Sequence, residues 1–296
     1  MDAATRRDFI ASGAAVAVPL ASRATARKPG TTAPGEGLLT GKRAVIYGAA
    51  GAMGSAVARA YAREGARLFL AGRTAARVEA LARELSAAGA DVTAGALDAL
   101  DGAAVDEHLD EIVRTAGGVD ISFNLIGVGG EQGRPLLDMA REAFATPIEN
   151  AMRTHFITAT AAARRMGERG GVILALTAQV ARKPYVASGG FGVACAAIEA
   201  LWRQLAVELG PRGIRLVTLR SSGSPDAPGV AAAVAEHAKL AGVTLEAFEA
   251  RIAEKTMLRH MPKMAEIANA AVLAASDLAS SMTAAVLNCT CGEIAD

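Results

Sequence analysis

The chain has few aromatic residues and almost no net charge, and both shortages narrow what it can bind. Only 4% of its 296 residues are Phe, Trp or Tyr, so a surface for stacking nucleic-acid bases is not expected. Its 31 basic residues are balanced by 30 acidic ones, which gives a formal charge of +1. Without an electropositive field, neither nucleic acid nor an anionic membrane is an expected partner. A small-molecule substrate is the better expectation.

Cysteine is also scarce, and the three cysteines do not form a metal-binding motif. Cys289 and Cys291 are expected on the last strand with both side chains on one face, and Cys195 lies far from them in sequence. No histidine stands near them in sequence, so the ligand types and spacing of a zinc site are missing. We predict no metal site and interpret the thiols as buried apolar side chains.

The first 26 residues have the layout of an export signal. Paired arginines at 6–7 precede an apolar stretch over 10–20 and an A-x-A sequence at 24–26, which is the order found in twin-arginine signal peptides. The apolar stretch is too short for a permanent transmembrane helix. We expect export to the periplasm without a stable membrane anchor. The alternative is a disordered leader or a mis-assigned start codon, with a cytoplasmic protein.

After a Pro/Gly/Thr-rich linker over 27–39, residues 40–296 are expected to form one folded domain. Short apolar runs typical of strands alternate there with helical patterns, and longer helices are expected over about 141–168 and 190–209. The seven strand-like runs are RAVIYG, RLFLAG, DVTAGA, VDISFN, GVILALT, IRLVTL and AAVLNC. Strands joined by helical crossovers predict a three-layer, doubly wound α/β fold of the Rossmann type, with a parallel sheet of about seven strands.

The turn after the first strand, YGAAGAMGSAV, has the pattern of a dinucleotide-binding turn. Small residues at this place let a diphosphate approach the backbone N–H groups at the start of the following helix. The residues expected to contact the cofactor here are Gly48, Ala50, Gly51, Ala52, Met53 and Gly54.

The end of the second strand, LAGRT, favours NADP(H) over NAD(H). A site for NAD usually has an Asp or Glu at this place to bind the ribose hydroxyls, whereas this chain has Gly72 and Arg73. A guanidinium can pair with a 2′-phosphate, and the absence of a carboxylate removes a repulsion. An exposed loop charge is the competing interpretation of Arg73.

Together these features resemble the short-chain dehydrogenase/reductase family over nearly all of residues 40–292. The family's Gly-x-x-x-Gly-x-Gly motif falls on Gly48, Ala52 and Gly54, with Ala at the middle position. The resemblance further places the family's adenine-contacting Asp at Asp98 and its Asn-Asn-Ala-Gly segment at Asn124 to Gly127. It implies an oxidoreductase that uses a nicotinamide dinucleotide and assembles as a homodimer or homotetramer through its two long helices, and Arg73 favours NADP(H) as that dinucleotide.

The catalytic half departs from the family pattern. The family has a Ser at the end of the fifth strand and Tyr-x-x-x-Lys on the next helix, and these positions fall on Ala178, Phe191 and Cys195. The chain contains no Tyr-x-x-x-Lys sequence. The family's active-site Asn falls where Asn150 and Ala151 stand. Loss of the general acid should remove about 10²–10⁴-fold in rate if nothing replaces it.

Three side chains are candidates to replace the missing catalytic groups. Thr177 precedes the lost Ser position, and Tyr185 lies in the loop ARKPYVASGG on the substrate side. His155 is one helical turn after Ala151 and can act as an acid near neutral pH. A structural role is the competing interpretation of each. A nucleophilic or redox role for Cys195 is a further alternative, since the resemblance places it beside the nicotinamide ribose.

Two functions of different classes therefore stay open. The first is an atypical NADP(H)-dependent oxidoreductase that acts on a carbonyl/alcohol pair or an activated C=C bond. The second is a non-catalytic dinucleotide-binding sensor or scaffold protein of the same fold. The segment 221–262 corresponds to the family's mobile substrate-covering region, and its apolar, helical pattern favours a lid over an apolar substrate.

Overall fold

The computed structural model describes residues 36–296, so the expected export signal and most of the expected linker lie outside the described residues. Close to residue 40, the described chain is packed against the domain. Leu39 is fully buried, and the backbone N–H of Leu38 donates to the Glu64 carboxylate at 2.9 Å. These contacts attach the start of the described chain to the end of the helix over Ala52–Arg63.

Seven parallel strands form one sheet in the order β3-β2-β1-β4-β5-β6-β7. The strands are β1 (Arg43–Tyr47), β2 (Arg67–Gly72), β3 (Val92–Ala96), β4 (Ile121–Asn124), β5 (Gly171–Ala178), β6 (Ile214–Ser221) and β7 (Ala285–Cys289). The chain runs outward from β1 to β3, then returns to β4 on the other side of β1. Crevices for ligands form where the loops diverge at such a switch point. The predicted doubly wound fold is confirmed.

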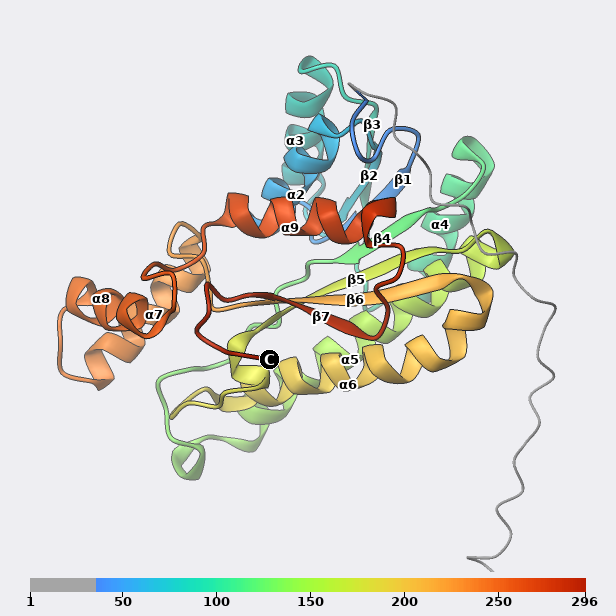
Figure 1. Cartoon of the computed structure of the whole chain (residues 1–296). Coiled ribbons are helices and arrows are strands. Elements are labelled where there is room, and N and C mark those ends of the chain that lie inside the picture. The colour runs from blue at the N-terminus through green and yellow to red at the C-terminus, as the bar shows by residue number, and fades with distance from the viewer. Residues whose placement is uncertain (1–35) are drawn as a thin grey trace, which may run out of the picture.

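Helices cover both faces of this sheet (Figure 1). One apolar core lies under α2 (Ala52–Arg63), α3 (Ala75–Ala87) and α9 (Met264–Ala275). The other lies under α4 (Gly102–Ala116), α5 (Arg141–Met166) and α6 (Gly189–Leu209). Short 3-10 turns are η1 (Leu136–Asp138), η2 (Gly167–Arg169), η3 (Gln179–Ala181), η4 (Gly210–Arg212) and η5 (Asp277–Ala279).

The long helices α5 and α6 are the two that the sequence predicts, and both belong to the second core. By length and composition alone, residues 189–212 could cross a membrane. Cys195, Ile198 and Trp202 on this helix are nevertheless buried in the core of the domain. The helix therefore has the burial of a central core helix.

Two further helices, α7 (Pro228–Leu240) and α8 (Leu245–Lys255), stand beside the carboxyl ends of β5, β6 and β7 (Figure 1). They occupy most of the segment in which the sequence predicts a helical lid. The C-terminal residues return to the same side of the domain, beside the start of α6. The loops, α7, α8 and the C-terminal segment thus meet at one edge of the sheet.

The expected placement of two cysteines on one face of the last strand is wrong. β7 ends at Cys289, and Cys291 lies in the following turn with a φ of +53°. Its sulfur lies 3.7 Å from Nδ1 of His260, which is distant in sequence. Burial raises the pKa of Cys289 to about 11, so this thiol stays protonated. Within residues 36–296, no three or more His, Cys, Asp or Glu side chains are grouped to hold a metal ion.

Candidate active site

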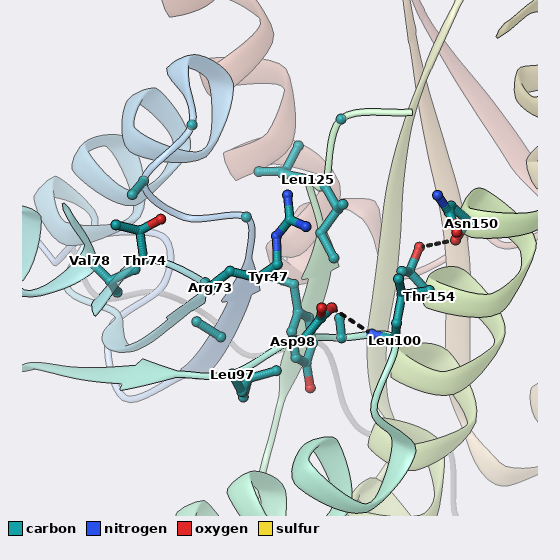
Figure 2. Close-up of a pocket in the computed structure, with 18 of the residues that line it drawn as sticks. Tyr47, Arg73, Thr74, Val78, Leu97, Asp98, Leu100, Leu125, Asn150 and Thr154 are labelled. Carbon is teal, nitrogen blue, oxygen red and sulfur yellow. Dashed lines mark hydrogen bonds between the residues drawn. The ribbon is translucent and has the colours of Figure 1, made fainter. Parts of the chain in front are cut away.

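A cavity of about 300 Å³ lies at the carboxyl end of β1, between the glycine-rich turn and the loop that follows β4 (Figure 2). This is the switch point of the sheet, and the volume is at the lower end of small-ligand pockets. Six of the predicted cofactor residues line the cavity: Gly48, Ala50, Gly51, Arg73, Asp98 and Gly127.

The glycines of the turn are required by close backbone approach. Gly48 has a φ of +71°, and a Cβ on it would lie 2.7 Å from the carbonyl oxygen of Leu125. A Cβ on Gly54 would lie only 2.2 Å from the carbonyl oxygen of Gly48. Gly51 caps α2, whose first N–H groups have no acceptor within the helix. This cradle fits the diphosphate of a dinucleotide.

Ala52, Met53 and Gly54 form the first turn of α2 and are not among the residues that line the cavity. Asn124 is buried, and its amide is used structurally. Its Nδ2 group donates to Oγ1 of Thr158 at 3.1 Å, and its oxygen accepts from the N–H of Ile126 at 3.0 Å. Asn124 thus fixes the loop that forms one wall of the cavity.

Two arginines line the part of the cavity next to the end of β2. Arg73 follows β2, and in Figure 2 its guanidinium reaches toward the loop at Leu125. Arg77 lies four residues later on α3, lines the same cavity, and donates from Nη2 to the carbonyl oxygen of Ala50 at 3.1 Å. Sequence reasoning missed Arg77, although its place in the first turn of the helix expected after the second strand was a usable signal.

Asp98 is exposed at the same end and accepts from the N–H of Leu100 at 3.0 Å, which fixes the turn after β3. From the opposite side, α5 contributes Asn150 and Thr154, and the Thr154 hydroxyl donates to the Asn150 carbonyl oxygen at 2.9 Å (Figure 2). Of the two residues that straddle the expected Asn position, Asn150 is exposed at the cavity, whereas Ala151 is buried.

The positions aligned with the missing catalytic residues lie between β5 and α6. Ala178 ends β5, Phe191 is in the first turn of α6, and Cys195 follows one turn later with 1% of its surface exposed. Burial raises the pKa of the Cys195 thiol to about 12. A thiol in this state is neither a nucleophile nor a fixed cation at neutral pH.

Thr177 is committed to a buried polar network. Its hydroxyl donates to Oε1 of Glu199 at 3.0 Å, and Glu199 accepts two bonds from Arg220, at 2.9 and 2.8 Å. Arg220 also pairs with Asp296 at 2.7 Å. The side chains of Glu199 and Arg220 are each 5% exposed. The Thr177 hydroxyl is therefore used inside the domain.

His155 lies in the interface between α5 and α6. Its Nδ1 atom is 2.8 Å from the carbonyl oxygen of Ala151, and its ring meets that of Trp202 edge to face, with 5.4 Å between ring centroids. Complete burial lowers the pKa of His155 to about 4, so the imidazole is neutral. This environment favours the structural interpretation of His155.

The neutral state of His155 predicts a loss of stability in mild acid. The unfolded chain binds a proton near pH 6.5, whereas the folded chain does so only near pH 4. Stability is therefore retained above pH 6.5 and lost as the pH falls toward 4, by about 3 kcal/mol. Urea unfolding at several pH values measures the free energy of unfolding, which should fall more steeply with decreasing pH for wild type than for His155→Gln. Equal pH dependence in the two proteins would contradict the neutral state of His155.

Tyr185 lies in the loop between β5 and α6, half-buried against α7. Its hydroxyl donates to Oε1 of Gln132 at 3.2 Å, and Nε2 of His237 lies 3.2 Å from the same oxygen. The two rings meet edge to face, with centroids 5.2 Å apart. Burial, with smaller contributions from Cys195 and Glu293, raises the pKa of Tyr185 to about 12. The phenol therefore stays protonated at neutral pH and can donate a hydrogen bond at the carboxyl edge of the sheet.

Comparisons with known proteins agree on one family. The profile described as Enoyl-(Acyl carrier protein) reductase matches residues 48–293. Enoyl-[acyl-carrier-protein] reductase [NADH] 1 of Rhizobium meliloti is 36% identical over 210 residues, covering 66% of this chain and 75% of that protein. L-rhamnose 1-dehydrogenase (NAD(P)(+)) of Azotobacter vinelandii is 33% identical over 184 residues, covering 60% and 71%.

Solved structures share the fold. Sorbitol-6-phosphate 2-dehydrogenase from Erwinia amylovora superimposes with a TM-score of 0.81 at 21% identity, covering 86% of this chain and all of that one. A short-chain type dehydrogenase/reductase from Mycobacterium marinum gives a TM-score of 0.72 at 26% identity, covering 87% and 97%.

Proposed function

Because the chain belongs to the short-chain dehydrogenase/reductase family, whose members are nicotinamide-dependent oxidoreductases, we propose that it is an oxidoreductase with an atypical active site. Its proposed substrates are a carbonyl/alcohol pair or an activated C=C bond. The observation that carries the proposal is the cavity at the switch point, where Gly48 and Gly54 keep the backbone open to a diphosphate. The names of the matched relatives support both substrate classes.

NADP(H) is the proposed cofactor. When bound, it supplies or accepts the hydride. Arg73 and Arg77 supply two positive charges next to the end of β2, where the adenosine of the dinucleotide would lie. A 2′-phosphate is the group that they would neutralise. The matched relatives support a nicotinamide cofactor of either kind, since one name specifies NADH and another NAD(P)(+). The preference for NADP(H) therefore rests on the two arginines.

Reversing the charge of one arginine tests this preference. Arg73→Glu should weaken NADPH binding by about 10-fold to 100-fold and leave NADH nearly unchanged, because only NADPH carries the 2′-phosphate. Isothermal titration with both nucleotides measures the two dissociation constants. Arg77→Glu should act in the same direction. The control is Arg83→Glu, an exposed charge farther along α3. Equal weakening of NADPH and NADH by Arg73→Glu would remove the assignment.

In the proposed reaction, Tyr185 orients the substrate oxygen. Its phenol stays protonated, lies at the carboxyl edge of the sheet, and can turn from Gln132 to a bound carbonyl. Thr177 and His155 are less suited, because the Thr177 hydroxyl donates to Glu199 and His155 is buried in a helix interface. Hydride transfer depends on how cofactor and substrate are oriented, so it does not require the missing Tyr and Lys.

Turnover distinguishes the proposal from its alternative. Purified protein is mixed with NADPH or NADH and with acetoacetyl-coenzyme A or crotonyl-coenzyme A, and nicotinamide absorbance is followed. Consumption that depends on the acyl thioester supports an oxidoreductase. Tight nucleotide binding without consumption across a broad carbonyl and enoyl panel supports the second candidate, a non-catalytic sensor or scaffold. The side chains of Ala178, Phe191 and Cys195 favour that candidate, because none is a proton donor at neutral pH.

Assembly and location complete the proposal. Phe156 on α5 and Val193 and Val207 on α6 are exposed apolar side chains, which supports a homodimer or homotetramer built through these helices. The twin-arginine pattern at residues 6–7 supports export to the periplasm, with a cytoplasmic protein as the alternative. A protein exported in its folded state could bind the dinucleotide in the cytoplasm before export.

A further inference from the structure

Glu293 brings a carboxyl group to the edge of the sheet where the catalytic residues of the family are missing. It lies in the segment after β7, and its backbone N–H donates to the carbonyl oxygen of Thr290 at 3.0 Å. The same oxygen accepts from the hydroxyl of Ser222, which follows β6, at 3.2 Å. The other neighbour is Lys183, from the loop after β5. The segments that follow the adjacent strands β5, β6 and β7 therefore meet at one place.

The carboxyl group of Glu293 is enclosed but not fully hydrogen-bonded. Its side chain is only 11% exposed. Within the described part of the chain, Oε2 is buried without a hydrogen-bond partner. The nearest cation, Nζ of Lys183, is 3.7 Å from Oε1, which is too long for a hydrogen bond, and the Lys183 side chain is half-exposed. A buried carboxylate oxygen without a partner is costly, and a proton on it reduces that cost.

The environment of Glu293 shifts its carboxyl group toward the protonated form. Burial raises the pKa of Glu293, against the opposing effects of Lys183, Lys255 on α8 and the hydroxyl of Ser222. Its charge is also felt by Tyr185, whose phenol in turn contacts Gln132 and His237. An acid is most effective when its pKa lies near the working pH. Tyr185, with a pKa of about 12, is the poorer proton donor of the two.

We propose that Glu293 is the general acid of this active site and that it replaces the missing tyrosine. This inference rests on the proposed oxidoreductase function. As hydride reaches the carbonyl carbon, the π electron pair moves to the carbonyl oxygen, and the O–H bond of Glu293 breaks as the substrate gains an O–H bond. Water then returns a proton to the carboxylate. In alcohol oxidation the carboxylate of Glu293 accepts the proton.

The first test measures the carboxyl group directly, without turnover. In the full-length protein labelled with ¹³C at the glutamate carboxyl, the signal of Glu293 is assigned by its loss in Glu293→Gln and followed against pH. The expected midpoint lies above that of glutamate carboxyls in the unfolded chain, because burial raises the pKa of Glu293. A midpoint at or below that of the unfolded chain would overturn the inference.

The second test measures the rate with NADPH and NADH and the two acyl thioesters named above. Glu293→Gln should lower kcat at least about 100-fold at pH 7 and change the dinucleotide Kd by less than about twofold. Glu293→Asp should keep part of the rate and shift its pH profile. Glu107→Gln, a change at an exposed glutamate on α4, is the control and should match wild type.

The outcomes separate this inference from the function on which it depends. If wild type turns over and Glu293→Gln keeps its rate, the general-acid assignment is wrong and the oxidoreductase proposal stands. If wild type consumes neither nucleotide with any substrate of the panel, both fail. A large loss in Glu293→Gln with intact nucleotide binding supports both.

Discussion

Replacement of Arg220 by methionine is expected to lower the free energy of unfolding by about 3–5 kcal/mol. Arg220 makes two hydrogen bonds to Glu199, and both side chains are almost completely buried. Methionine fills much of the volume but leaves the Glu199 charge without its cation inside the domain. Urea denaturation followed by circular dichroism measures the loss.

A double replacement shows whether the unpaired charge is the cause. Glu199→Gln combined with Arg220→Met removes both charges and leaves an amide that can still accept from Thr177. The double variant should therefore be more stable than Arg220→Met alone. Asp296→Asn should change stability by less than about 1 kcal/mol, because Asp296 is partly exposed. A double variant as unstable as the single one would assign the effect to lost packing instead.

Replacement of Gly54 by alanine should reduce dinucleotide affinity at least tenfold and destabilise the fold by about 1–3 kcal/mol. The added Cβ would lie 2.2 Å from the Gly48 carbonyl oxygen and 2.8 Å from the Cα of Ala49. Both neighbours are backbone atoms, so the turn itself must move. Because this turn forms the floor of the cavity, the movement should disturb the N–H groups that would meet the diphosphate.

Gly51 provides the matched control in the same turn. It has an ordinary φ of −73°, and its nearest neighbour to an added Cβ, the Gly48 carbonyl oxygen, is 3.1 Å away. Gly51→Ala should therefore cost much less stability than Gly54→Ala. Thermal unfolding and titration with NADPH and NADH give both quantities. If the two variants lose stability and affinity equally, close packing of α2 on the turn is not the reason that Gly54 is needed.

The fold and the glycine-rich turn could be predicted because their signals are local. Strand-like runs separated by helical patterns specify parallel crossovers, and the glycine spacing of the first turn reflects contacts between residues close in sequence, such as Gly48 with Gly54. Arg77 lies on the helix after the second strand, beyond the position where an Asp or Glu usually indicates NAD, so the pattern at the end of that strand does not include it. The other predicted residues that line the cavity nevertheless follow from the order of strands and turns along the sequence.

The catalytic half could not be predicted in the same way, because long-range contacts decide the state of each side chain. Thr177 donates to a glutamate 22 residues later, which in turn binds an arginine from the next strand. His155 loses its expected charge because Trp202 and the helix interface exclude water. Glu293, the proposed general acid, carries no motif, and only the folded chain brings it near Lys183 and the segment after β6.

Trp202 gives this chain an internal optical probe of one helix interface. It is the single tryptophan, it is buried, and its indole N–H donates to the carbonyl oxygen of Ile173 at 3.3 Å. Its emission therefore arises from one indole environment and should move to longer wavelengths when α5 and α6 separate. A protonated imidazole quenches a neighbouring indole, so the brightness of the folded protein should also follow the titration of His155 in acid.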